Sequence, residues 1–245
     1  MDAARIVGQD GNCPSQSPLL SHSNIAEQSI VLSAAPLFAN LSERECLEIA
    51  CSARVRTFAK NESLFAQGQP LRELILLRSG IVKHTQVSVN GNEVLLRFSR
   101  KGDVVNLQGE SACTHTCSAR ATETCKALVW EFSRIQSFLT RYPQMRINIS
   151  RILAAQLKEL EERFREVATE SASRRLALVL LRLLTQIGKP SSEGIQLSLN
   201  REELAQMTGS TVFTISRVLS AWSEQRLVVS RRESVVVRHP NRLQA

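Results

Sequence analysis

The sequence lacks several features that would place it in common classes of protein. No run of apolar residues approaches the ~18 that a transmembrane helix needs. The first residues lead into polar sequence and not into the apolar core of a secretory signal peptide. The motifs Gly-x-x-x-x-Gly-Lys-Ser/Thr, Gly-x-Ser-x-Gly and His-Glu-x-x-His are all absent. These absences argue against a membrane protein, a secreted protein and the enzymes that carry these motifs.

Acidic residues are fewer than basic ones. The chain has 245 residues, with 31 Lys and Arg against 23 Asp and Glu, which gives a net charge of +8. A positive excess favours an anionic partner, although charge alone does not separate DNA from RNA or a membrane surface. The length leaves room for two domains. Because we expect a cytoplasmic protein, the six cysteines are predicted to be thiols or ligands rather than disulfides.

Residues 200–219, hereafter the reading head, predict two short helices joined by a tight turn. Asn200 is a good N-cap, and Glu203 can complete a capping box. Gly209 lies between the helices, where a left-handed backbone is needed. This layout predicts a helix-turn-helix, whose second helix lies in the DNA major groove; the alternative is a plain helical hairpin. The apolar positions that we expect to face the core are Leu204, Met207, Val212, Ile215, Val218 and Leu219.

A basic hairpin is predicted directly after the second helix. Two apolar runs at 227–229 and 235–237 flank a short turn that contains Arg231 and Arg232. A hairpin in this place forms a wing that can touch the DNA backbone. The wing favours DNA binding over the plain helical hairpin.

The pattern along the chain predicts four regions and an α+β fold. Residues 1–30 are polar and predict a flexible arm. Residues 31–142 begin with a helix capped by Ser42 and continue as short strands between glycine turns, which predicts a β-roll. Residues 143–170 predict a long helix and a hinge, and residues 171–245 predict the winged helix-turn-helix.

Local signals place further elements within these regions. The clearest strands of the roll are 74–77 and 93–98, and Asn90-Gly91 predicts a two-residue hairpin turn. In the second half of the chain we expect a hinge at 169–173, a helix at 174–187, a loop at 189–194 and a strand at 195–199.

The long helix carries a stripe of apolar residues at steps of three and four. Pro143 suits its first turn. With charged residues around the stripe, the spacing predicts a coiled-coil seam between two copies of the chain. The alternative is a helix packed on its own β domain; we favour the homodimer because a two-fold dimer can read a palindrome. The predicted dimer interface comprises Ile149, Leu153, Leu157, Leu160, Phe164 and Val167.

Together, the roll, the long helix, the hinge and the winged helix-turn-helix resemble the cAMP receptor protein/FNR superfamily of bacterial transcription regulators. The resemblance runs from about Pro36 to Leu243 and is most specific at Pro36-Leu37-Phe38, Lys101-Gly102-Asp103 and 211–217. It implies a cytoplasmic homodimer that binds double-stranded DNA at a palindromic operator, with RNA polymerase as a further partner, without membrane or enzymatic function. The alternative is a cyclic-nucleotide-type ligand-binding module that acts through protein partners.

The resemblance also implies which side chains touch DNA. Ser216 and Arg217 match base-contacting positions, and an arginine can bind the O6 and N7 edge of guanine. Phe213 stands where the family normally has Glu, so an acceptor for the cytosine amine is replaced by an aromatic edge that could touch a thymine methyl. Arg201, Thr211 and Thr214 match phosphate-contacting positions. The predicted contact set is Arg201, Thr211, Val212, Phe213, Thr214, Ser216, Arg217, Arg231 and Arg232.

The effector is left open by the sequence. In cAMP-binding members a Gly-Glu pair is followed by an Arg-Ser pair. Here Gly109-Glu110 is present, but Cys117 stands at the arginine position, before Ser118. Loss of that charge-assisted contact with the cyclic phosphate disfavours cAMP. An FNR-type iron–sulfur cluster is disfavoured because the N-terminal arm has only Cys13.

The segment Cys113-Thr114-His115-Thr116-Cys117 has three interpretations. It resembles the haem-ligand segment of the carbon-monoxide-sensing branch, with Cys113 or His115 as the iron ligand. It could also be a reactive thiol group or a partial site for another metal. The third interpretation is a loop of small buried residues without a ligand. The predicted effector residues are Glu110, Cys113, His115, Cys117 and Ser118.

Overall fold

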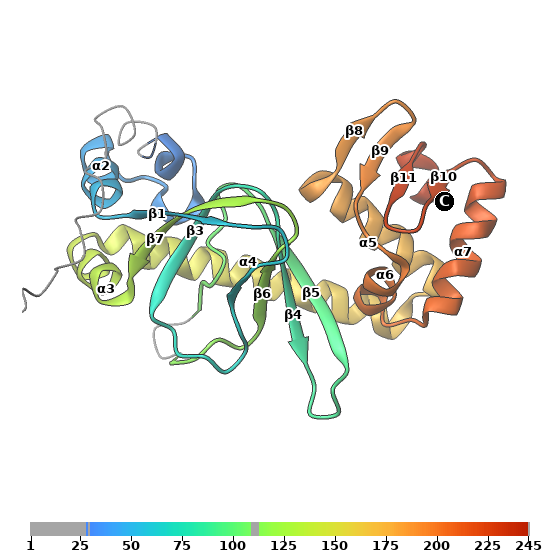
Figure 1. The fold of residues 1–245 in the computed structure, drawn as a ribbon, viewed down its shortest axis with the longest axis horizontal. Helices are drawn as coiled ribbons and strands as arrows, with labels where there is room; N and C mark the ends of the chain where they lie inside the picture. Colours follow the sequence, from blue (N-terminus) through green and yellow to red (C-terminus); the bar gives the residue numbers. More distant parts are fainter. Residues whose placement is uncertain (1–27, 29, 109–112, 245) are drawn as a thin grey trace, which may run out of the picture.

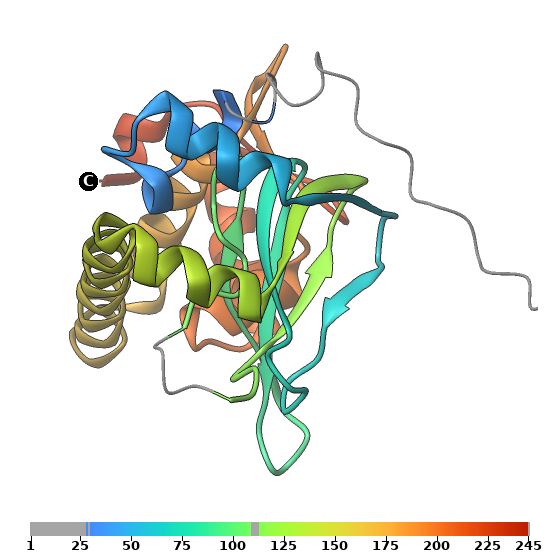
Figure 2. The same ribbon diagram turned by 90° about the vertical axis from the view of Figure 1, so that its left-hand side faces the viewer.

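The computed structural model describes residues 28, 30–108 and 113–244 and has an α+β fold. A strand-rich N-terminal part and a smaller C-terminal part lie next to each other along the long helix α4 (Pro143–Thr169), as Figure 1 shows. Figure 2 shows α4 at one side of the strands. No helix in the described part of the chain is both long and apolar enough to cross a membrane. The predicted fold class is confirmed.

Seven antiparallel strands in two sheets form the roll. One sheet has the order β1-β7-β3 and the other the order β2-β6-β4-β5. The strands are β1 (Arg54–Phe58), β2 (Ser63–Phe65), β3 (Glu73–Ser79), β4 (Val82–Val87), β5 (Glu93–Ser99), β6 (Ser118–Ala121) and β7 (Cys125–Glu131). Both strands expected at 74–77 and 93–98 are confirmed. The buried residues between the sheets include Phe58, Ile75, Leu77, Val82, Val105 and Ala119.

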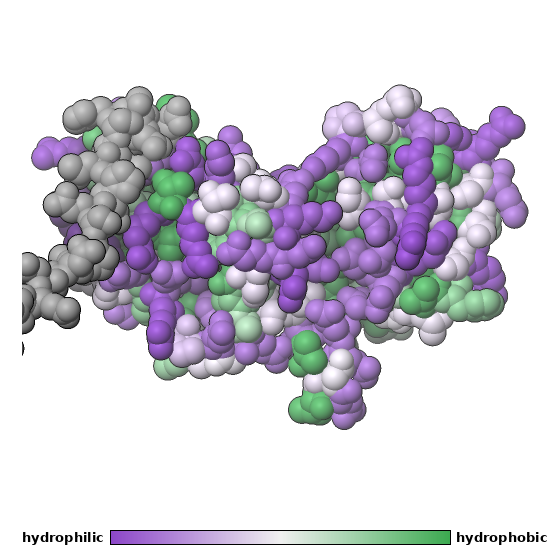
Figure 3. Space-filling view, viewed as in Figure 1, coloured by the Kyte–Doolittle hydropathy of each residue, from purple (hydrophilic) through white to green (hydrophobic). Residues whose placement is uncertain are grey.

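The β4–β5 hairpin extends away from the roll (Figure 1). Ser88 and Asn92 still pair, because the Ser88 N–H donates to the Asn92 carbonyl at 2.9 Å. The loop is therefore residues 89–91, with Gly91 at φ 80°. The hairpin loop therefore has three residues where two were predicted. A glycine in the left-handed conformation can close a three-residue loop as well as a two-residue one. Figure 3 shows apolar side chains at the tip, where Val89 is fully exposed.

Helices cover one end of the roll and share a second core with it. They are η1 (Pro36–Phe38), α2 (Glu43–Cys51) and α3 (Phe132–Arg141), together with the start of α4. The capping box at Ser42 is confirmed. The Glu45 backbone N–H donates to the Ser42 hydroxyl, and the Ser42 backbone N–H donates to the Glu45 carboxylate. The Trp130 indole donates to the Ile49 carbonyl at 2.9 Å inside this core. Helix α3 is not among the predicted elements, although its buried residues have helical spacing.

The C-terminal part packs three helices against a small sheet of order β10-β11-β9-β8. Its elements are α5 (Ala172–Ile187), β8 (Lys189–Ser191), β9 (Gly194–Leu197), α6 (Arg201–Thr208), α7 (Val212–Glu224), β10 (Val228–Ser230), β11 (Val235–Val237) and η2 (Pro240–Gln244). Two expectations need correction. Ser171 caps α5, so the break after α4 is two residues and not five. Residues 189–191 form a strand that pairs with β9, where a loop was predicted.

Candidate nucleic-acid interface and effector region

The reading head is a helix-turn-helix built by its own capping residues. The Glu203 N–H donates to Asn200 Oδ1 at 2.8 Å, and the Asn200 N–H donates to the Glu203 carboxylate at 3.1 Å. Gly209 ends α6 with φ 58°, in the left-handed conformation that glycine adopts at low cost. Among the predicted core residues Leu204, Ile215 and Leu219 are fully buried, and Met207 and Val218 are partly buried.

Val212 is the exception, because its side chain is 45% exposed. Its assignment to the apolar face is wrong: as the first residue of α7 it lies outside the stripe that begins at Ile215. Phe213 is 77% exposed beside it, and Arg217 is exposed one turn further along. The outer face of α7 therefore presents two apolar side chains and a guanidinium, over an inner face that is packed in the core.

Hydroxyl groups surround the N-terminus of α7. Thr211 is the N-cap and accepts a hydrogen bond from the Thr214 N–H at 3.1 Å. The two threonine hydroxyls lie 2.9 Å apart. The free N–H groups and the dipole of a helix N-terminus attract anions. This end of α7 can therefore receive a phosphate, as the sequence predicts for both threonines.

Arginines of the head and the wing are held by neighbours in the same domain. Arg201 donates to the Ser230 hydroxyl at 3.2 Å, which ties the first helix to the wing. Arg231 bonds the Glu193 carboxylate at 2.5 Å, and its side chain keeps half of its surface exposed. Arg232 is exposed in the wing turn. All three arginines belong to the same domain as α7.

The apolar stripe of α4 divides into two halves. Ile149 is buried in the core shared with the roll, and Leu153 packs against that core. Ile149 therefore packs inside its own chain, as the alternative of a helix packed on its own domain predicts for this half. The second half has no such cover in the described chain: its exposed fractions are 57% for Leu157, 61% for Leu160, 75% for Phe164 and 50% for Val167.

The roll contacts the C-terminal part through its β4–β5 sheet. Lys83 on β4 bonds the Glu203 carboxylate at 2.9 Å. Arg100 donates to the Thr185 carbonyl near the end of α5 at 2.8 Å. Phe98 packs against the C-terminal core between these polar contacts. In Figure 1, α7 lies on the side of the C-terminal part that faces away from the roll.

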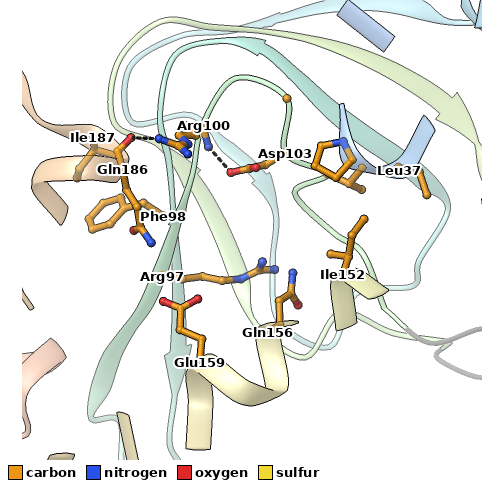
Figure 4. Close-up of a pocket in the computed structure, with 13 residues that line it drawn as sticks. Leu37, Arg97, Phe98, Arg100, Asp103, Ile152, Gln156, Glu159, Gln186 and Ile187 are labelled. Atoms are coloured by element: carbon orange, nitrogen blue, oxygen red, sulfur yellow. Dashed lines mark hydrogen bonds between the residues drawn. The ribbon is translucent and has the colours of Figure 1, made fainter. Parts of the chain in front are cut away.

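A cavity of about 220 Å³ lies where the roll, α4 and α5 meet (Figure 4). Arg97 from β5 points into it, opposite Gln156 and Glu159 of α4. Burial lowers the pKa of Arg97, and burial raises the pKa of Asp103 on the same cavity wall. No local motif predicts this cavity, because its lining comes from four separate segments of the chain.

The segment 113–118 lies against residues 67–71 rather than forming an open ligand site. The His115 backbone N–H donates to the Gln69 carbonyl at 2.9 Å. The Gln67 backbone N–H donates to the Ser118 hydroxyl at 3.0 Å. The His115 ring stacks on Phe65 with 3.8 Å between centroids, and burial lowers its pKa. Cys113 is exposed. The predicted Glu110 lies outside the described residues.

Cys117 faces the inside of the roll. Its sulfur lies 3.8 Å from His84 Nδ1, while His84 Nε2 lies 2.8 Å from the Ser99 hydroxyl. Burial raises the pKa of the Cys117 thiol, and burial together with Arg97 lowers the pKa of His84 to about 3. The neutral Cys117 thiol does not supply the charge-assisted contact that an arginine at this position makes with a cyclic phosphate, and weak cAMP binding stays a prediction.

The structure bears on the metal interpretation of residues 113–117 but does not test the haem interpretation. No group of three or more His, Cys, Asp or Glu residues in the described parts of the chain could hold a metal ion. Cys113, His115 and Cys117 are therefore not brought together as a metal site. A haem needs only one axial ligand from this segment, so the haem interpretation stays a prediction.

Comparison with known proteins assigns both parts of the chain. A cyclic nucleotide-binding domain model matches residues 55–142, and a Crp-like helix-turn-helix domain model matches residues 174–245. The transcriptional activator protein Anr of Pseudomonas protegens is 27% identical over 210 residues, which cover 85% of this chain and 86% of Anr. The fumarate and nitrate reduction regulatory protein of Vibrio cholerae is 26% identical over 204 residues, or 82% of this chain and 81% of the relative.

A solved structure supports the fold. FixK2 from Bradyrhizobium japonicum superposes with a TM-score of 0.67, covering 78% of this chain and 95% of FixK2 at 21% identity. Fold, site and relatives define a DNA-binding transcription regulator with an effector-sensing domain of the cyclic-nucleotide-binding type. The chain belongs to the CRP/FNR family. The family consists of transcription regulators and not enzymes. Its match replaces the alternative function of a ligand-binding module that does not bind DNA. The domain boundaries and the single contact residues stay predictions.

Proposed function

We propose that the protein acts in the cytoplasm as a homodimer that binds a palindromic operator and regulates transcription there together with RNA polymerase. The observation that carries this proposal is the second half of α4. Four large apolar side chains are exposed in a row on it: Leu157, Leu160, Phe164 and Val167. A second copy of the same stripe is the partner that coiled-coil spacing favours.

The energetics support pairing of these stripes. Burying apolar surface is worth roughly 25 cal/mol per Å², and contiguous apolar patches on soluble proteins usually mark interaction sites. Glu159 and Arg163 on α4 form an ion pair and face the roll, because Arg163 also donates to the Leu96 carbonyl. This ion pair is thus engaged within the protomer, and the exposed apolar stripe is left for the partner.

The contacts with DNA follow from the outer face of α7. We assign base contacts to Ser216 and Arg217, and contact with a thymine methyl to Phe213. Val212 extends the same apolar edge. Phosphate contacts are assigned to the remaining predicted residues, Arg201, Thr211, Thr214, Arg231 and Arg232. Phosphate contacts fix the orientation of the protein, and base contacts supply specificity.

The contacts between the roll and the C-terminal part provide a route for the effector signal. A ligand that shifts β4 or β5 would move Lys83 against Glu203 in the first turn of α6, and Arg100 against the end of α5. The outer face of α7 is free of these contacts. We therefore propose that the effector changes the orientation of the reading head rather than uncovering it.

Sedimentation and selection from random DNA test the proposal. We expect the wild-type protein to sediment as a dimer and to select two inverted half-sites. Leu160→Lys places a charge in the seam and should give a monomer whose operator affinity falls by roughly 1,000-fold, because one half-site alone remains bound. Ile147→Lys is the matched control, since Ile147 is an exposed apolar residue of α4 outside the stripe. A wild-type monomer, or a Leu160→Lys dimer with unchanged affinity, would contradict the proposed seam.

A further inference from the structure

Arg175, in the first turn of α5, bonds to the ends of two other helices. Its Nε donates to the Thr208 carbonyl at 2.7 Å, and Nη2 donates to the Gly209 carbonyl at 3.4 Å and the Ser210 hydroxyl at 3.1 Å. Its Nη1 donates to the Glu170 carbonyl at 2.8 Å. One guanidinium therefore joins the C-cap of α4 to the turn between α6 and α7.

The chemistry of this junction requires an arginine. The last carbonyls of a helix have no partner within the helix and carry partial negative charge, so a cation beside them is stabilising. The guanidinium presents five N–H donors in a rigid plane, and so it can bond two helix ends at once. A lysine ammonium is a point charge on a flexible stem and cannot span both ends.

The junction lies between the proposed dimer seam and the recognition helix. Only two residues separate α4 from α5, and Arg175 bridges this break. A second bond crosses the same junction: Arg182 on α5 lies 2.6 Å from the buried carboxylate of Glu166 on α4. Val167 on α4 also lies next to the turn, because a Cβ at Gly209 would be 3.8 Å from it. The end of α4 and the turn between α6 and α7 are thus held together through Arg175.

We propose that Arg175 is a positioning residue that sets the separation of the two recognition helices in the dimer. It would thereby select the spacing between half-sites that the protein accepts. This inference rests on the proposed homodimer and adds the residue that determines its DNA geometry. Recognition helices of such dimers lie about 34 Å apart, so a change of about 3.4 Å corresponds to one base pair of spacing. A small rotation at this junction is therefore enough to change the preferred operator.

The test uses the full-length protein and two DNA libraries. The first is a randomised half-site that gives the base preference, and the second holds two inverted copies of the selected half-site with spacers of roughly 0 to 10 base pairs. Wild type should prefer one spacer length. Arg175→Ala should lose about tenfold in affinity for that spacer and accept its neighbours, while the half-site preference and the dimer remain unchanged. Arg175→Lys should recover part of the spacing preference.

Two further variants control the test. Ser210→Ala removes one of the bonds to the guanidinium and should keep the wild-type spacing. Arg44→Ala removes an exposed arginine from α2, far along the chain from the junction, and should behave as wild type. If thermal melting shows that Arg175→Ala is unfolded, the spacer preference of Arg175→Lys is compared with that of wild type instead. Lysine retains the positive charge but lacks the planar set of N–H donors.

The outcomes separate the inference from the proposed function. If Arg175→Ala weakens binding to every spacer equally, the residue does not position the heads and the inference is wrong. A changed half-site preference would also overturn it, because Arg175 would then shape the recognition helix itself. If wild type sediments as a monomer and shows no preferred spacing, the proposed homodimer fails, whatever Arg175 does.

Discussion

The reading head and the roll orient their polar side chains in opposite directions. On α7, Thr211 and Arg217 face outward over a buried apolar stripe. In the roll, Cys117 and His84 face inward and contact each other, and neither is charged at neutral pH. The head is built to offer groups to a large external partner. In the roll, in contrast, His84 and Cys117 contact each other inside the core, and so the geometry supports a DNA contact more strongly than it supports any one effector.

The largest effect expected on folding stability concerns the buried histidine of the roll. The pKa of His84 is about 3 in the folded chain, against 6.5 for an ordinary histidine. Below pH 6.5 the unfolded state therefore binds a proton at His84 that the folded state does not bind. The free energy of unfolding is highest above that pH and decreases as the pH falls. At pH 5 the loss is about 2 kcal/mol, from 1.36 kcal/mol per pH unit.

Urea unfolding between pH 7 and pH 5 measures this loss. The His84→Gln variant should show a correspondingly flatter pH dependence, because it lacks the titrating group. His239→Gln is the control, since His239 is exposed in the C-terminal part. Equal slopes for wild type and His84→Gln would mean that the roll does not hold this imidazole neutral, and the contrast with the head would weaken.

A second prediction tests whether the roll and the head move as one body. Lys83→Met removes the ion pair with Glu203 and leaves the capping bonds to Asn200 in place. We expect amides of α6 to exchange with deuterium several-fold faster, corresponding to about 1 kcal/mol for a partly buried charged hydrogen bond. Lys126→Met, an exposed lysine of β7, is the matched control. Unchanged exchange in α6 would show that this contact does not couple the two parts.

The smallest effect is expected at the wing. Arg231 shares Glu193 with Arg238, so part of its charge is compensated before DNA arrives. Arg231→Ala should make the slope of log K against log salt shallower by about 0.9 for each protomer if the residue binds a phosphate. Glu193→Gln should shift affinity in the opposite direction by a few-fold. If neither variant changes the slope or the affinity, the wing does not contact DNA.

The same contrast explains what the sequence could predict. The capping box at Asn200, the left-handed Gly209 and the spacing of Leu204, Ile215 and Leu219 are local signals, and all are confirmed. Val212 is misassigned because helical periodicity does not say where the packed stripe begins. The strand at 189–191 is missed because it contains Pro190 and depends on pairing with β9.

The contacts that no local pattern predicts join distant segments. His84 meets Cys117 across two neighbouring strands, and Arg175 reaches the α6–α7 turn more than thirty residues later. The cavity beside Arg97 is likewise assembled from separate elements. The apolar stripe of α4 is intermediate: its spacing predicts a buried seam, but only the structure shows that Ile149 is covered by its own roll and Leu160 is not.

The most direct test of the account is the base preference of the recognition helix. Wild type and Arg217→Ala are each used to select from randomised half-sites. Arg217 is exposed on α7 and is assigned to a guanine, so its loss should cost about 1–3 kcal/mol per half-site and relax the preference at one base pair only. Arg217→Lys should restore charge and affinity but little of that preference. If both variants select the same sequence as wild type, the outer face of α7 does not read bases and the central claim is contradicted.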